Sequence, residues 1–249
     1  MYQKERLDEI LALVRRYGYV TVKYLVAELH YSNATINRDL NILEGQGQLR
    51  RTYGGVEIVE STNVPLPFRY HKMRAEKLKI CKKAAELVED GDTIFIDAAT
   101  TTEYMMEFLT DRKGLTVITN NIAIVTHLSE YSVRVICLGG RVVEPPCMLD
   151  GLETVENAKH YHVDKMFFAT GQVSGDGRVL AGEAYYLLQK TMLKNSDKVY
   201  YLADHEKLNR AAGARKILCE FSEIDGVISD YEFDESIRKA YPDTQFIKV

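Results

Sequence analysis

The chain has 249 residues, of which 46% are hydrophobic and 27% charged, so it is long enough for one large or two smaller globular domains. Its formal net charge of −4 argues against a protein that coats nucleic acid without sequence preference. No apolar run approaches the roughly 18–20 residues that cross a bilayer, and the charged first residues lack the apolar stretch of a signal peptide. The four cysteines form no CxxC pair. These features predict a cytoplasmic protein with reduced thiols, no metal and no cofactor.

The charge is divided unequally along the chain. Residues 1–58 contain eight Lys and Arg against seven Asp and Glu, so they carry a balance of +1 and the remainder carries −5. DNA-binding domains normally show a stronger basic excess. Any DNA binding by residues 1–58 must therefore depend on where the charges are placed.

Three short helices are predicted in this first segment. The first has apolar residues at helical spacing and ends before Gly18. Thr21 is the predicted N-cap of the second helix and Ser32 that of the third, because hydroxyls there bond free N–H groups of the first turn. Residues 49–59, LRRTYGGVEIV, then show two short strand patterns around a Gly-Gly turn. Three helices and a two-stranded ribbon predict a winged helix-turn-helix over residues 1–58.

The third helix has a polar outer face suited to DNA. A helix-turn-helix places its second helix in the major groove, where Asn can bond both edge atoms of adenine and Arg both acceptors of guanine. Arginines at the base of the wing can neutralise phosphates or enter a minor groove. The predicted DNA-contacting residues are Ser32, Asn33, Thr35, Asn37, Arg38, Asn41, Arg50 and Arg51. The alternative is an ordinary surface helix in which Arg38 pairs with Asp39 or Asp8.

After residue 58 the pattern changes twice. Residues 59–72 contain prolines and no clear period, which predicts a linker. From residue 73 to 249 apolar strand patterns alternate with helices, which predicts an α/β domain with a mainly parallel sheet covered on both faces. The strand patterns lie at 93–98, 115–119, 133–140, 164–170, 197–204 and 226–230, with helices near 74–89, 101–110, 121–130 and 183–194.

Polar residues follow several of these strands. In an open α/β sheet, ligands bind beyond the carboxyl ends of the strands, and N–H groups at a helix start attract anions. The predicted effector-binding residues are Asp97, Ala99, Thr100, Thr101, Thr102, Asn120, Gly139, Gly140, Arg141, Asp204 and Lys207. Two simpler interpretations remain open: Thr100 or Thr101 caps a helix, and Asp204 forms a surface pair with Lys207.

The first segment resembles the signature of DeoR-family regulators. That signature has a Ser, Thr-Ile-Arg-Arg-Asp-Leu, a Leu-Glu, a Gly and a basic pair before His-Gly-Gly, and residues 32–55 read SNATINRDLNILEGQGQLRRTYGG. The departures are Asn37, where the family usually has its first Arg, and Tyr53, where it usually has His. Asn37 removes a charge from the reading face and predicts a shift from guanine towards adenine.

Residues 73–230 resemble the sensor domain of the same family, which is similar in fold to ribose-5-phosphate isomerase. The matching positions are Asp97, Thr100, Thr101, Asn120, Gly139, Gly140, Gly151, Asp164, Gly171, Asp204, Lys207 and Asp230. Ala99 departs from the pattern, because the family usually has Gly there, and its methyl group can narrow the loop or require a negative φ. The resemblance implies a regulator that binds double-stranded operator DNA and a phosphorylated sugar effector, as a homodimer or homotetramer.

Three functions are compatible with these features. The first is a repressor of a carbohydrate-metabolism operon whose DNA affinity changes with its effector. The second is a sugar-phosphate isomerase or similar hydrolase with an accessory DNA-binding head, for which Asp97, Glu103, Asp204 and Lys207 offer acid–base groups. The third is an activator, or a regulator that responds to another anion. The DNA-binding head favours a regulator that is not an enzyme.

Overall fold

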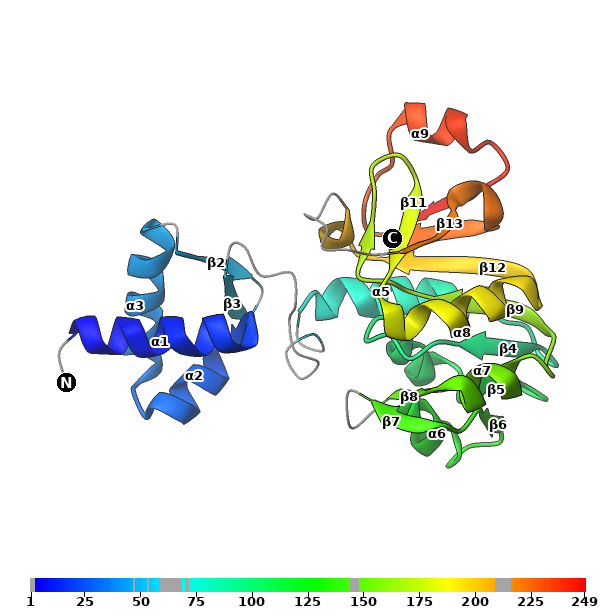
Figure 1. Cartoon of the computed structure of the whole chain (residues 1–249), viewed down its shortest axis with the longest axis horizontal. Coiled ribbons are helices and arrows are strands. Elements are labelled where there is room, and N and C mark those ends of the chain that lie inside the picture. The colour runs from blue at the N-terminus through cyan, green and yellow to red at the C-terminus, as the bar shows by residue number, and fades with distance from the viewer. Residues whose placement is uncertain are drawn as a thin grey trace. The chain divides into compact units, whose positions relative to one another are not determined.

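The computed structural model divides the chain into two compact units between Arg74 and Ala75, whereas the sequence placed the boundary after residue 72 (Figure 1). We refer to residues 1–74 as the head and to residues 75–249 as the body. The structure describes residues 3–46, 48–52, 54–58, 69, 72–143, 148–208 and 216–249. Tyr53 and most of the predicted linker lie outside the described residues.

The head contains the three predicted helices with their predicted caps. Its elements are α1 (Gln3–Tyr17), β1 (Tyr19–Thr21), α2 (Val22–Leu29), α3 (Asn33–Gly45), β2 (Leu49–Thr52) and β3 (Gly55–Ile58). The Thr21 hydroxyl accepts a bond from the Tyr24 N–H at 3.0 Å. The Ser32 hydroxyl accepts one from the Thr35 N–H at 3.2 Å. Both hydroxyls satisfy donors that a helix start leaves free, which confirms the two helix starts.

The wing differs from the prediction in one respect. Its sheet has three strands in the order β1-β3-β2, all antiparallel, so the predicted two-stranded ribbon lacked β1. The three residues of β1 are too few to show a strand period, and their pairing with β3 is a contact between distant segments. Gly55 is required in β3, because a Cβ there would lie 2.4 Å from the Val20 carbonyl oxygen.

The body is built on a parallel sheet, as predicted. Every described pairing in its seven-stranded sheet is parallel. In spatial order the strands are β15 (Gln245–Lys248), β14 (Gly226–Ser229), β12 (Ser196–Ala203), β9 (Val163–Phe168), β4 (Thr93–Ile96), β5 (Thr116–Thr119) and β6 (Arg134–Cys137). The helices are α5 (Arg74–Ala85), η1 (Thr102–Phe108), α6 (Ile122–Leu128), α7 (Leu152–Ala158), α8 (Glu183–Lys194), η2 (His205–Lys207), η3 (Phe221–Glu223) and α9 (Glu235–Ala240).

Two hydrophobic clusters cover the two faces of this sheet. Two neighbouring residues of β9 belong to different clusters. Phe167 lies in the same cluster as Ile80 of α5, and Phe168 lies in the same cluster as Leu188 of α8. Successive side chains of a strand point to opposite faces, so a strand covered on both sides is apolar throughout. This explains the unbroken apolar runs in the sequence. Among the described helices, none combines the length and hydrophobicity needed to span a membrane.

Several parts of the body differ from the sequence prediction, which also lacked α7 and β15. The helix expected at 101–110 is the 3₁₀ helix η1, and the strand expected at 133–140 ends at Cys137. Two small antiparallel sheets were not predicted, because their strands are short and flank turns. They consist of β7 (Arg141–Val143) with β8 (Met148–Asp150), and of β10 (Gln172–Val173), β11 (Arg178–Ala181) and β13 (Lys216–Glu220).

Candidate functional site

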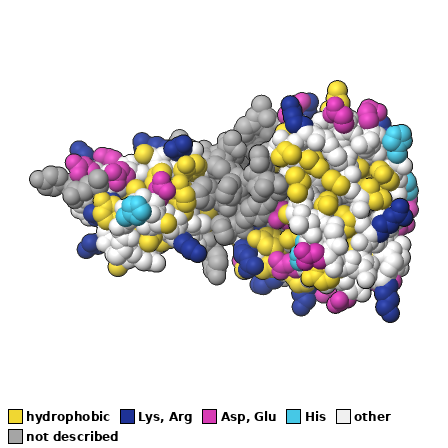
Figure 2. All heavy atoms as spheres, turned by 90° about the horizontal axis from the view of Figure 1, so that it is seen from below, with side chains coloured by type: hydrophobic (Ala, Val, Ile, Leu, Met, Phe, Trp, Pro, Cys, Tyr) yellow, Lys and Arg dark blue, Asp and Glu magenta, His cyan; other side chains and the backbone are white. Residues whose placement is uncertain are grey.

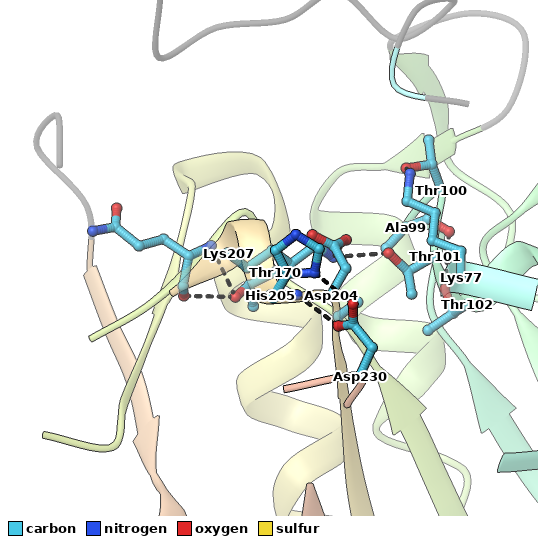
Figure 3. Close-up of polar contacts among 12 residues, drawn as sticks. Lys77, Ala99, Thr100, Thr101, Thr102, Thr170, Asp204, His205, Lys207 and Asp230 are labelled. Carbon is cyan, nitrogen blue, oxygen red and sulfur yellow. Dashed lines mark hydrogen bonds and ion pairs between the residues drawn. The ribbon is translucent and has the colours of Figure 1, made fainter. Parts of the chain in front are cut away.

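The predicted effector residues gather where the parallel strands end. Asp97 follows β4, Asn120 follows β5 and Asp204 follows β12. Because β12, β9, β4 and β5 are neighbours that run in the same direction, their carboxyl ends form one edge of the sheet. The edge brings together polar groups that are far apart in the sequence (Figure 3).

Two ammonium groups meet the loop that follows β4. The Lys207 Nζ donates to the Thr101 hydroxyl at 2.7 Å, and the Lys77 Nζ donates to the Thr100 hydroxyl at 3.2 Å (Figure 3). Thr101 is the residue before η1, but its side chain makes no cap bond, so the interpretation of Thr101 as a helix cap is wrong. Its hydroxyl is instead oriented by Lys207.

Sequence reasoning missed Lys77, which is only 4% exposed. It lies on the inner face of α5, at helical spacing from the buried residues Ile80, Cys81 and Ala84. A lysine in register with an apolar face is a readable signal, because lysines are almost never fully buried without a partner. Its contact with Thr100 shows why this lysine points inward.

Asp204 and Lys207 also differ from the surface pair considered as an alternative. The Lys207 Nζ lies 3.8 Å from the Asp204 Oδ2, but both side chains are largely buried. Lys207 therefore bridges an acidic group on one side and the threonine loop on the other. An anion in this position would meet a cation that is already desolvated and oriented, which strengthens the attraction.

Asp97 lies beneath the loop. Its carboxylate accepts bonds from the Thr102 hydroxyl, the backbone N–H groups of Ala99 and Ala169, and the Gln189 Nε2 at 2.7 Å. Burial raises the pKa of Asp97, although these four bonds oppose that effect by favouring the charged form. The carboxylate thus holds the loop and connects it to Gln189 of α8, a second residue that sequence reasoning missed.

Ala99 fits the loop without backbone strain. Among the described non-glycine residues, only His30 and Met73 have a positive φ. The Ala99 N–H donates to Asp97 at 3.3 Å. The sequence raised the possibility that the loop needs a glycine conformation at this position, and the observed backbone does not require one.

Asn120 joins the edge of the sheet to the β7–β8 hairpin. Its Nδ2 donates to the Leu149 carbonyl oxygen at 2.9 Å, while its Oδ1 is buried and accepts no bond from the described residues. A buried acceptor without a donor is costly, which makes the Oδ1 suited to a ligand hydroxyl. Nearby, the Thr154 hydroxyl donates to the Gly139 carbonyl oxygen at 2.7 Å.

The two glycines of this segment pack against α7. Gly140 has φ 116°, and a Cβ there would lie 2.0 Å from the Thr154 hydroxyl oxygen. Arg141, the first residue of β7, is exposed. The glycines therefore shape the hairpin that covers Asn120.

His205 and Asp230 form a further pair, just after the ends of β12 and β14. Asp230 is one of the positions that match the sensor domain of the family, whereas His205 was not singled out from the sequence. The His205 ring bonds the Asp230 carboxylate (Figure 3). The backbone N–H of His205 donates to the same carboxylate at 2.8 Å. Burial alone would lower the pKa of His205, but Asp230 and the charges of Asp204 and Glu206 outweigh burial and raise it.

The predicted DNA-contacting residues of the head fall into two groups. Asn33, Arg38 and Asn41 are exposed on α3, as expected of a reading face. The Asp39 carboxylate pairs with Arg6 and is fully buried, so it is not the exposed partner suggested for Arg38. In the face seen in Figure 2, the Lys and Arg side chains of the head are scattered rather than gathered into one patch.

The remaining residues of the predicted set contact other protein groups. Ser32 and Thr35 form the cap described above, and their hydroxyls lie 2.8 Å apart. Arg50 bonds Glu57, whose side chain also pairs with the buried Lys72. Burial would raise the pKa of Glu57, but the two cations lower it. Asn37 and Arg51 bond each other.

The geometry defines a class of protein: a helix-turn-helix head joined to an α/β body with a polar site at the ends of its strands. Residues 6–62 match the family model of the DeoR-like helix-turn-helix domain, and residues 72–231 match that of the DeoR C-terminal sensor domain. The chain therefore belongs to the DeoR family and is a DNA-binding transcriptional regulator.

Two similar proteins that are named as repressors agree with this assignment. The HTH-type transcriptional repressor GlcR of Bacillus subtilis is 33% identical over 233 residues, which cover 92% of this chain and 89% of GlcR. The lactose phosphotransferase system repressor of Staphylococcus aureus is 32% identical over 246 residues, covering 95% and 96% of the two chains. Among solved structures, ribose 5-phosphate isomerase A of Neisseria gonorrhoeae is 18% identical with a TM-score of 0.41, covering 55% of this chain and 54% of that one.

Proposed function

We propose that this protein is a cytoplasmic repressor of a carbohydrate-metabolism operon, and that a phosphorylated sugar changes its affinity for operator DNA. Family membership and the repressor names of the similar proteins support the regulatory role. A homodimer or homotetramer suits this role, because paired heads match paired operator half-sites.

The observation that carries the effector proposal is the pair of ammonium groups on the threonine loop. Lys77 and Lys207 contact Thr100 and Thr101, which are adjacent in the sequence. Two cations and two hydroxyls beside each other offer the charge and the donors that a phosphate dianion needs. Asp204 and the Oδ1 of Asn120 provide acceptors for sugar hydroxyls. The composition of the site thus favours a ligand that is anionic at one end and hydroxylated at the other.

A ligand at this loop can influence α8, because the buried Gln189 of this helix bonds Asp97. The Gln189 Nε2 donates both to Asp97 beneath the loop and to the Ala169 carbonyl oxygen at 3.1 Å. A ligand that binds two states unequally shifts their populations by the ratio of its affinities. In the proposed mechanism, effector binding moves helices that carry subunit contacts or lead to the linker, and this alters the spacing of paired heads.

The proposal is tested with the full-length protein and a panel of phosphorylated sugars, each paired with its unphosphorylated form. We expect at least one phosphorylated sugar to raise the melting temperature, its unphosphorylated form to have no effect, and the same ligand to change affinity for operator DNA. Replacing Lys77 or Lys207 by Met should weaken binding by about tenfold or more, because each removes a charge-assisted bond. Lys79→Met is the matched control, since Lys79 is an exposed lysine of α5.

Two outcomes would contradict the effector proposal. One is that no stabilising ligand alters DNA affinity, and the other is that Lys77→Met and Lys207→Met bind as tightly as the wild type.

The enzymatic alternative depends on the acid–base groups at the same site. Asp97 has a raised pKa, as a general base often does, but its carboxylate already accepts four bonds within the protein. Incubation of the purified protein with pentose and hexose phosphates distinguishes the two functions. Substantial turnover would favour the enzyme, and we expect none.

A further inference from the structure

The inference concerns how the wing is joined to the reading helix, and it rests on DNA binding by the head. Arg51 of β2 reaches across to α3: its Nη2 donates to the Asn37 carbonyl oxygen at 2.8 Å, and its Nη1 donates to the Asn37 Oδ1 at 3.0 Å. The Arg51 backbone N–H donates to the Glu44 Oε1 at 2.8 Å. Asn37 and Glu44 are seven residues apart and therefore lie on the same side of α3, so Arg51 contacts this helix over two turns.

The Arg51 contact determines which way the Asn37 amide faces. A guanidinium group only donates hydrogen bonds, so the Asn37 atom opposite it must be the acceptor Oδ1. The Nδ2 then points the other way, where it donates to the Asn33 carbonyl oxygen at 2.9 Å and also bonds the Asn33 Oδ1. The amide has two hydrogens, and both have acceptors within α3.

Adenine readout would require the Asn37 amide to bond the base in place of its partners within the protein. Asn recognises adenine by donating from Nδ2 and accepting at Oδ1 at the same time. Asn37 can do this only by giving up the Nδ2 bonds to Asn33, and its Oδ1 would then be shared between Arg51 and the base. Arg38 and Asn41, by contrast, are exposed. The structure thus disfavours the adenine contact that the sequence predicted for Asn37.

We propose that the Arg51–Asn37 contact is a specificity-determining latch. It fixes the orientation of α3 relative to the wing and withdraws Asn37 from base reading, so that Arg38 and Asn41 meet the bases. Arg51 is then a positioning residue and not a phosphate ligand. The Nη1 bond of the latch requires a side-chain acceptor at position 37, whereas the Nη2 bond uses the backbone carbonyl oxygen. The first Arg of the family signature would place two guanidinium groups together, and neither of them can accept a bond. The latch therefore gives this chain a base preference that an Arg at position 37 would change.

The test is selection from random DNA duplexes by the full-length protein, followed by affinity measurements at several salt concentrations. The variants are Arg51→Ala, Arg51→Lys, Asn37→Ala and Asn37→Arg, with Arg15→Ala as the control for loss of an arginine charge. Arg15 is an exposed arginine of α1 and lies outside the predicted DNA-contacting set. Melting temperatures of all variants are measured in parallel.

We expect Arg51→Ala and Asn37→Ala to change the preference for at least one base of the half-site by about tenfold, the range of one bidentate contact. The double variant should show the same preference as Arg51→Ala, because removing Arg51 already abolishes both of its bonds to Asn37. Arg51→Lys should not restore the wild-type preference, since a single ammonium lacks the rigid fork that bonds two acceptors together. Arg15→Ala should retain the wild-type preference.

The proposal is overturned if Arg51→Ala and Asn37→Ala select the wild-type sequence. A uniform loss of affinity in Arg51→Ala, with the salt slope reduced by about one, would assign Arg51 to a phosphate instead. Should Arg51→Ala fail to fold, Asn37→Ala and Asn37→Arg still decide, because both retain Arg51. If the wild type itself selects no sequence, then DNA reading by the head fails and not only the latch.

Discussion

The polar groups of the predicted sites are exposed in the head and buried in the body. In the head, Asn33, Arg38 and Asn41 project from α3 into solvent, whereas in the body Asp97 and Asn120 are buried at the ends of strands. The difference matches the size of the ligand expected by each unit. DNA is met by a surface, while a small anion is bound most strongly where water is excluded. Substitutions of buried polar groups in the body should therefore lower its unfolding free energy, whereas substitutions on the exposed face of α3 should lower the affinity for DNA.

The largest effect is expected at Asp97. Asp97→Ala removes an acceptor shared by four donors, three of them buried, and opens a space beneath the loop, so the body should lose about 4 kcal/mol of unfolding free energy. Denaturant unfolding followed by circular dichroism measures the loss. An unfolding free energy within about 0.5 kcal/mol of the wild-type value would contradict the idea that the buried polar groups of the body stabilise it.

Gly140 tests whether the hairpin above Asn120 depends on backbone shape. Gly140→Ala forces a side chain into a positive φ and against Thr154, so we expect a loss of about 2–3 kcal/mol. Gly45→Ala is the control, because a Cβ at Gly45 meets nothing within 4 Å. Equal melting temperatures for the two variants would show that the hairpin adapts.

Arg38 is the corresponding test in the head. Arg38→Ala should weaken binding to the selected operator about 10- to 100-fold at fixed salt, the range of one bidentate base contact. Its unfolding free energy should change by less than about 0.5 kcal/mol, because the side chain is exposed. Arg15→Ala, at an exposed position of α1, is the control for loss of charge. An unchanged affinity would exclude Arg38 from the reading face.

The smallest effect concerns pH. Because the pKa of His205 is raised above its ordinary value of 6.5, the folded state binds the proton more tightly than the unfolded chain. The resulting stability is fully present below pH 6.5 and is lost as the pH rises through the higher folded pKa. His205→Gln should flatten this dependence by about 1–2 °C in melting temperature, since the ring is half exposed and its pair is screened. An identical pH profile would count against the His205–Asp230 pair.

Local chemistry allowed much of the fold to be predicted from sequence. The caps at Thr21 and Ser32 and the apolar runs of the sheet depend on neighbouring residues and on repeat period, so they are visible without a structure. The strand ends at Asp97, Asn120 and Asp204 were found for the same reason. Their binding roles, like those of the other residues assigned to the site, stay predictions.

Tertiary structure decided which polar groups meet. Lys207 and Thr101 are 106 residues apart, and Gln189 and Asp97 are 92 residues apart, so no local pattern joins them. Even over 14 residues, the Arg51–Asn37 contact depends on how β2 lies beside α3. The sequence by itself determined the helices of the head, most strands of the parallel sheet and the strand ends that carry polar residues. Only the packing of distant elements decided that Lys77 faces the threonine loop and that Asn37 faces Arg51, because hydrogen bonds require groups to meet in space.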